Sequence, residues 1–99
     1  MAGVYIKAIQ DASSLTDVER MQFLALMQGV FRVWEEAYFQ WDRGRLEDSY
    51  WNGIKTLFLD VLAIPAAREA WSLRKHTYSP QFRGWLDDQT IGSYKLRDT

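Results

Sequence analysis

The stretch FRVWEEAYFQWDRG, from Phe31 to Gly44, decides the fold. Its aromatic residues Phe31, Trp34, Tyr38 and Trp41 recur at spacings of three and four, which places them on one side of a helix. The same apolar seam extends back through Leu24 and Met27. Arg43-Gly44 is typical of a helix C-terminus. The stretch therefore predicts the second half of a long amphipathic helix that ends at about Asp42.

Local signals predict where the other helices begin and end. Thr16 followed by Glu19 forms a capping box that opens the long helix near Asp17. Pro65 ends one helix and suits the first turn of the next, and Ser79-Pro80 combines an N-cap with a proline at the first helical position. We expect shorter helices at about 46–63, 65–76 and 80–88, a short helical turn or arm at 4–11 and a flexible tail at 90–99.

The predicted fold is all-α, a small helical bundle. The short connection at 43–45 makes the first two helices antiparallel neighbours. The second helix carries two apolar flanks, one formed by Leu46, Tyr50, Ile54, Leu57, Val61 and Ile64, the other by Trp51, Phe58 and Leu62. We expect a long antiparallel helix hairpin covered by two shorter helices, which contribute Trp71, Phe82, Trp85 and Leu86. The prediction is a single domain over residues 1–89.

Composition excludes several classes of function. The 99 residues carry a formal charge of −1, whereas a general nucleic-acid binder needs a basic surface. Because the chain has no cysteine and one histidine, we expect no disulfide, no transition-metal site and no cofactor. No apolar run approaches the ~20 residues of a membrane-spanning helix. A cytoplasmic location fits the lack of cysteine.

The adjacent carboxylates Glu35 and Glu36 diverge by about 100° around the helix, so they cannot act as a pair in one site. Glu36 falls on a solvent-facing side with Arg32, Gln40 and Arg43. Glu35 lies at the edge of the apolar seam, where a half-buried carboxylate needs a partner. It is either a structural ion pair or hydrogen bond that ties the helices together, or a ligand or acid–base group.

Basic residues surround Trp71 at helical spacing. They are Arg68, Arg74, Lys75 and, further along, Arg83. One interpretation is an anion site for phosphate or carboxylate, with Glu35 nearby. The other is that these cations balance the acidic residues at 35–48 and stack on Trp71. His76 fits a helix C-terminus, and we predict no catalytic residue because no nucleophile stands in a clear relation to it.

Phe39 projects away from the apolar seam, on the side of Met21, and Leu59 does the same on the second helix. Either the short terminal elements cover these side chains, or Met21, Phe39 and Leu59 mark a surface that contacts another chain.

Several motifs resemble a family of uncharacterised bacterial helical domains. They are Leu15-Thr16 with Glu19-Arg20, Glu35 with Tyr38 and Gln40, Gly44 with Leu46, Trp51, Pro65 with Arg68 and Trp71, and Tyr78-Ser79 with Phe82. The resemblance spans residues 4–87 and implies a helical fold without an assigned activity. It also implies that a membrane helix precedes this domain in many members, and it suits a structural clasp between Glu35 and Arg68.

These observations favour a non-catalytic interaction or regulatory module whose partner is another protein or a second copy of the chain. In an anchored longer form it would lie at the inner face of the membrane. The alternative is a small anion-binding or metabolite-binding domain, or a weak enzyme, that uses the basic residues around Trp71.

Overall fold

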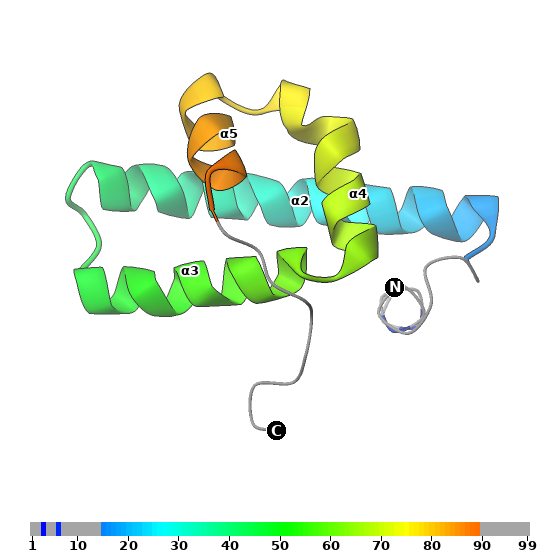
Figure 1. Cartoon of the computed structure of the whole chain (residues 1–99), viewed down its shortest axis with the longest axis horizontal. Coiled ribbons are helices and arrows are strands. Elements are labelled where there is room, and N and C mark those ends of the chain that lie inside the picture. Colours follow the sequence, from blue (N-terminus) through cyan, green and yellow to red (C-terminus); the bar gives the residue numbers. More distant parts are fainter. Residues whose placement is uncertain (1–2, 4–5, 7–14, 90–99) are drawn as a thin grey trace.

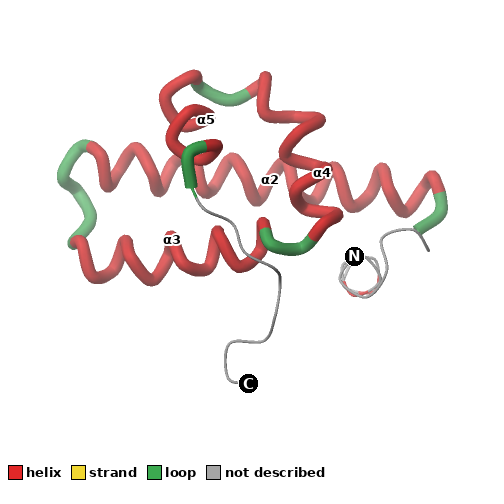
Figure 2. The backbone as a smooth tube through the Cα atoms, viewed as in Figure 1, coloured by secondary structure: helices red, strands yellow, loops and turns green. Residues whose placement is uncertain are grey.

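The computed structural model describes residues 3, 6 and 15–89, and this part of the chain is built from helices joined by turns (Figures 1 and 2). The elements are α2 (Asp17–Asp42), α3 (Asp48–Leu62), α4 (Pro65–Arg74), a 3₁₀ turn η2 (Lys75–Thr77) and α5 (Pro80–Asp87). The prediction of a small all-α bundle is confirmed. The predicted arm at 4–11 and tail at 90–99 lie outside the described residues.

The ends of α2 follow the local signals in the sequence. The Thr16 hydroxyl accepts a hydrogen bond from the Glu19 N–H at 3.1 Å, and the Glu19 carboxylate accepts one from the Thr16 N–H at 3.0 Å. This is the predicted capping box. At the other end Gly44 has a φ of +76°, a left-handed conformation that glycine adopts without a steric cost.

The shorter helices differ from the prediction by one or two residues at most of their ends. The helix α3 begins at Asp48 rather than near Leu46, with Glu47 as its N-cap. The helix expected to continue to His76 is α-helical only to Arg74, and the next three residues form the 3₁₀ turn η2. The N-cap of α5 is as predicted, since the Ser79 hydroxyl accepts from the Phe82 N–H at 3.3 Å.

Aromatic rings fill the space between α2 and α3. Trp34 stacks on Phe58 with ring centroids 4.4 Å apart, and Trp41 stacks on Trp51 at 5.0 Å. Because the two pairs run in opposite order along the two helices, α2 and α3 are antiparallel. Figure 1 shows them side by side, with α4 crossing from the end of α3 to α2 and α5 returning beside the middle of α2.

One side of the α2–α3 pair is closed by α4 and α5. Trp71 is buried, Phe82 and Leu86 are fully buried, and Trp85 packs half-buried against the same core. These are the four side chains that the sequence assigned to this task. Trp71 contacts Phe31, and Phe82 and Trp85 contact Tyr38. Leu86 belongs to the same continuous core cluster.

Two residues of the predicted first flank of α3 do not pack as expected. Tyr50 is 62% exposed and Leu57 is 59% exposed. Tyr50 and Leu57 lie two turns apart on one stripe of α3, and Ile54 lies between them about one turn from each. Neither α4 nor α5 covers Tyr50 or Leu57. The prediction that the whole flank is core is therefore wrong at these positions.

Candidate interaction surface

Glu35 ties the middle of α2 to the start of α5. Its Oε1 atom accepts a hydrogen bond from the Arg32 guanidinium at 2.7 Å, and its Oε2 atom accepts one from the Ser79 backbone N–H at 2.8 Å. The Glu35 side chain is only 13% exposed. A carboxylate at a helix N-cap satisfies an otherwise unpaired donor and interacts favourably with the helix dipole. Both contacts give Glu35 a structural role.

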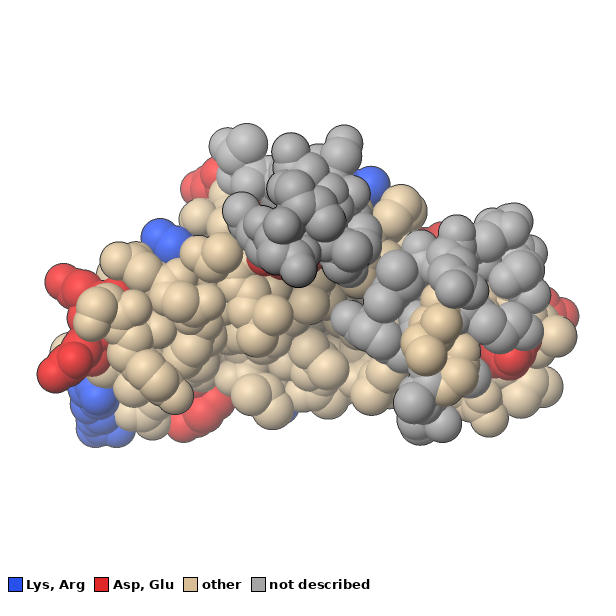
Figure 3. All heavy atoms as spheres, turned by 90° about the horizontal axis from the view of Figure 1, so that it is seen from below, with Lys and Arg blue, Asp and Glu red and all other residues tan. Residues whose placement is uncertain are grey.

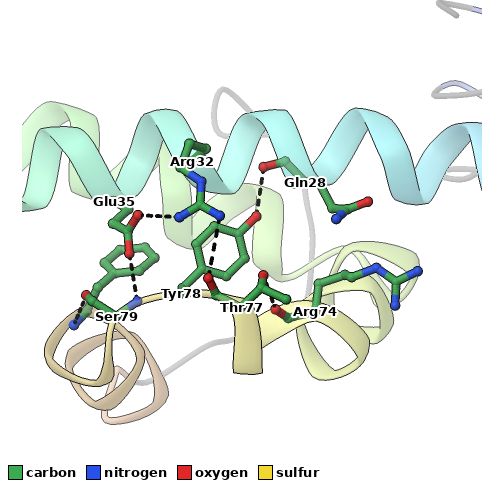
Figure 4. Close-up of polar contacts among 8 residues, drawn as sticks. Gln28, Arg32, Glu35, Arg74, Thr77, Tyr78 and Ser79 are labelled. Atoms are coloured by element: carbon green, nitrogen blue, oxygen red, sulfur yellow. Dashed lines mark hydrogen bonds and ion pairs between the residues drawn. The ribbon is translucent and has the colours of Figure 1, made fainter.

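Arg32 completes this clasp from the solvent side. Its guanidinium lies over the Tyr78 ring, 4.3 Å from the centroid, and also approaches the Thr77 carbonyl at 3.5 Å. The Tyr78 hydroxyl in turn donates to the Gln28 carbonyl of α2 at 2.7 Å. Figure 4 shows that these side chains converge from α2 and from the η2–α5 connection. Arg32 is exposed, as the sequence predicted, with 57% of its side chain in solvent, but its contacts with Glu35 and Tyr78 were not predicted.

The protonation state of Glu35 follows from the same contacts. Burial of the carboxyl acts to raise its pKa, but the hydrogen bond from the Ser79 N–H and the charge and hydrogen bond of Arg32 outweigh it, so the pKa lies below the ordinary value of 4.5. Glu35 is thus a carboxylate at neutral pH. A general acid requires the opposite shift.

Arg68 does not pair with Glu35. It lies exposed on α4, and among the residues that the structure describes its guanidinium group has no hydrogen bond or ion pair. The predicted clasp between these two residues is therefore wrong: Glu35 does join two helices, but its partners are Arg32 and the N-terminus of α5. The packing of α4 places its small residues Ala66, Ala67 and Ala70 inward, which turns Arg68 outward.

The basic cluster around Trp71 is organised by Asp87. The Trp71 indole N–H donates to Asp87 Oδ1 at 2.9 Å, and the Lys75 ammonium lies 3.2 Å from Asp87 Oδ2. Trp71 is buried against Phe31, Tyr78 and Phe82. In the described part of the chain no cation stacks on its ring, in contrast to the expectation. Arg74 and Arg83 are half-buried and Arg68 is exposed.

The side of the α2–α3 pair away from α4 and α5 carries an apolar surface. We call it the open face and define it by these residues: Val33 and Ala37 of α2, Leu46 of the connecting turn, and Tyr50, Ile54 and Leu57 of α3. Val33 is 66% exposed, similar to Tyr50 and Leu57. A groove of about 570 Å³ runs along this face between the two helices.

Charged side chains are sparse on α3. Its 15 residues include Asp48, Lys55 and Asp60 as the only ionisable groups besides Tyr50. In Figure 3, which looks onto the α3 side, much of the described surface in view is uncharged. Acidic and basic side chains gather at the end that holds the turn joining α2 to α3, and further acidic side chains lie at the opposite end. An exposed apolar patch with a polar rim is typical of a protein contact surface.

A smaller apolar pocket, of about 180 Å³, lies between the first half of α2 and α4. Its described lining includes Leu15, Phe23, Leu24, Ala70 and Leu73. The Arg20–Glu69 ion pair, 3.5 Å between Nη1 and Oε1, stands at its edge. Met21 also lines this pocket and is 72% exposed.

The residues predicted as interface candidates are therefore spread over different parts of the surface. Met21 is exposed, whereas Phe39 and Leu59 are half-buried and pack against the core. Phe39 contacts the Tyr38 ring, and the Arg43 guanidinium covers it at 5.2 Å. Tyr50 and Leu57 were missed because the sequence pattern assigned them to a packing flank of the second helix, and Val33 was not singled out. The sequence did contain a signal: the apolar residues of α3 span a wider part of its circumference than packing against one neighbouring helix can bury.

No protein-family model, curated protein or solved structure matches this chain. The resemblance to bacterial helical domains accordingly stays a prediction. Among the described helices none is both long and apolar enough to cross a bilayer. The described residues also contain no group of three or more histidine, aspartate or glutamate side chains placed to hold a metal ion.

Proposed function

We propose that the protein is a non-catalytic helical interaction module that contacts its partner through the open face. The observation that carries this proposal is the exposure of Val33, Tyr50 and Leu57, between 59% and 66%, on one groove-bearing side of the α2–α3 pair. Burying a large apolar side chain completely stabilises a protein by about 1.5–3 kcal/mol relative to leaving it in water. A partner that covers them would recover part of this free energy.

The polar residues of the molecule support the same proposal. Glu35 and Asp87 both help to hold α4 and α5 in place, and other carboxylates, among them Asp42 and Glu69, likewise join helices. A catalytic site brings together groups with perturbed pKa values in a concave pocket. Glu35 instead is held in its ionised form by a backbone N–H and an arginine, an arrangement that favours rigidity.

The anion-binding alternative has weaker support. Two of its donors, the Lys75 ammonium and the Trp71 indole N–H, already bind Asp87. An anion at this place would have to displace that carboxylate or lie beside it, where like charges repel. We therefore retain the interaction module as the proposed function.

The proposal includes a location in the cytoplasm, at the inner face of the membrane in an anchored longer form. This location rests on the absence of cysteine and on the family resemblance.

The test uses a matched pair of substitutions on α2. Val33→Asp places a charge on the open face, and Val18→Asp places the same charge at a site of nearly equal exposure, 67%, in the first turn of the helix. Affinity capture from cells that express the protein naturally is expected to recover a partner with the wild type and Val18→Asp but to lose it with Val33→Asp. Equal recovery by all three proteins would contradict the proposal.

A further inference from the structure

The open face lies on an antiparallel pair of helices that α4 and α5 leave uncovered on one side. This inference rests on the proposed function and names the partner. We infer that the face is covered by a second copy of the chain, so that two α2–α3 pairs pack face to face as a four-helix arrangement. The argument rests on the shape, the charge and the size of the face.

The shape of the face suits another pair of helices. Tyr50 and Leu57 form a ridge along α3, Val33 forms one on α2, and the groove between them has Ala37 and Ile54 in its lining. Ridges of one helix pair fit the grooves of another when the helices cross at about 20°. A second copy presents the same ridges and the same groove. The contact would be isologous, with each copy's Val33 and Tyr50 meeting the same surface of the other copy.

The charge of the face also fits a second copy. The charged residues that line the groove are Arg32, Glu35 and Glu36. Arg32 is paired with Glu35, and Glu36 accepts a hydrogen bond from Gln40 at 2.9 Å. Nucleic acids and anionic membrane surfaces select clusters of lysine and arginine, which this rim does not offer among the described residues. A nearly neutral rim around an apolar centre allows two identical surfaces to meet without strong repulsion.

The size of the face sets the expected affinity. Helix α3 has 15 residues, which corresponds to about 22 Å, and two adjacent helices are about 20 Å wide. Two such faces in contact bury on the order of 1,000 Å², the lower limit for a specific interface. Area alone does not fix affinity, but at this size we expect a weak dimer that forms at micromolar or higher concentration.

Sedimentation equilibrium of the full 99-residue chain tests this inference. Over protein concentrations from about 5 µM to about 1 mM, the average mass of the wild type is expected to rise from 11.6 kDa toward twice that value. Val33→Asp and Leu57→Asp are expected to weaken the association at least tenfold. Val18→Asp is expected to associate like the wild type. Circular dichroism of each variant checks that the helices are retained, as expected for substitutions at exposed positions.

The outcomes separate this inference from the proposed function. A wild type that stays at 11.6 kDa over the whole range overturns the second-copy inference, but partner capture that depends on Val33 would leave the interaction module intact. A dimer that persists unchanged in Val33→Asp and Leu57→Asp also overturns it, because the copies would then meet elsewhere. A dimer lost in both variants and kept in Val18→Asp supports the inference.

Discussion

The two faces of the α2–α3 pair both carry large apolar and aromatic side chains, but only one of the faces is covered by α4 and α5. On the covered face, Phe31, Tyr38 and Trp51 pack under α4 and α5 and are at most 5% exposed. On the open face, Val33, Tyr50 and Leu57 are apolar or aromatic too, yet more than half of each is in water. Hydrophobicity alone therefore does not define the core. What distinguishes the faces is which one α4 and α5 cover.

Polar contacts decide which face is covered. The Ser79 N–H binds Glu35 at one end of α5, and Asp87 at its other end binds Trp71 and Lys75. Between them, the Gln81 amide donates to the Tyr38 hydroxyl and to Asp42, each at 3.1 Å. Hydrogen bonds are directional, so these contacts fix where the apolar side of α5 docks. The open face has no comparable set of contacts to a further described helix.

The largest expected effect is on the covered face. Phe31→Ala removes a ring that is fully buried and lies 5.2 Å from Trp71 and 5.4 Å from Trp34. We expect the free energy of unfolding to fall by about 3–5 kcal/mol, from lost burial and the cavity left behind, as measured by urea denaturation. Leu57→Ala on the open face is the control and should change it by at most about 0.5 kcal/mol at low protein concentration. Similar losses for both variants would contradict the assignment of the two faces.

A smaller effect is expected where α5 meets α4. Asp87→Ala leaves the indole N–H of the buried Trp71 without its acceptor and Lys75 without its ion pair. The expected loss is about 1–3 kcal/mol, the cost of an unpaired buried donor, again from urea denaturation. The neighbouring Asp88 is exposed at the end of α5, so Asp88→Ala is a matched control. If the two alanine variants were equally stable, Asp87 would have no part in holding α5.

The prediction of the helices from sequence succeeded where the determinants are local. The capping box at Thr16, the left-handed Gly44, the proline at 65 and the N-cap Ser79 all act within a few residues. Such signals place most helix ends within two residues. The predicted partner of Glu35 was wrong because the determinant is distant. One of the two partners of Glu35 is the backbone N–H of Ser79, 44 residues away, and no side-chain pattern identifies a backbone donor.

The open face was missed for a related reason. Both stripes of α3 repeat every three to four residues, so both read as core. Which of them is buried depends on the side to which the turn at Ile64 and Pro65 directs α4. Arg32 was within reach of sequence reasoning, because residues three apart on a helix are neighbours and Arg32 and Glu35 have that spacing.

The link between α2 and α5 should also depend on pH. Because the folded pKa of Glu35 lies below its ordinary value of 4.5, its stabilising contribution is fully present above that value and is lost as the pH falls through the folded pKa. Glu35→Gln should therefore be less stable than the wild type at pH 7, and the difference should shrink between about pH 5 and pH 3. Thermal unfolding of both proteins across this range measures it. A difference that is independent of pH would show that ionised Glu35 does not hold α5.

The smallest expected effect distinguishes Arg32, the side chain that pairs with Glu35 in the structure, from Arg68, the partner that the sequence suggested. The structure places the Arg32 guanidinium 2.7 Å from Glu35 and leaves Arg68 without a described ion-pair partner. A double-mutant cycle isolates the interaction between two side chains from the other effects of their removal. For Arg32→Ala with Glu35→Ala we expect a coupling of about 0.5 kcal/mol, as for an ion pair at this helical spacing that remains open to solvent on the arginine side.

For Arg68→Ala with Glu35→Ala the expected coupling is zero within error, because the two side chains share no contact. Arg68→Ala alone should change the free energy of unfolding by at most about 0.5 kcal/mol, as for other exposed positions. Raising the salt concentration should reduce the Arg32 coupling and leave the Arg68 cycle unchanged, since only the first contains an ion pair that ions can screen. A coupling to Arg68 larger than that to Arg32 would contradict the assignment of Arg32 as the side-chain partner of Glu35, and it would instead make a contact between α2 and α4 the main interaction that holds the covered face.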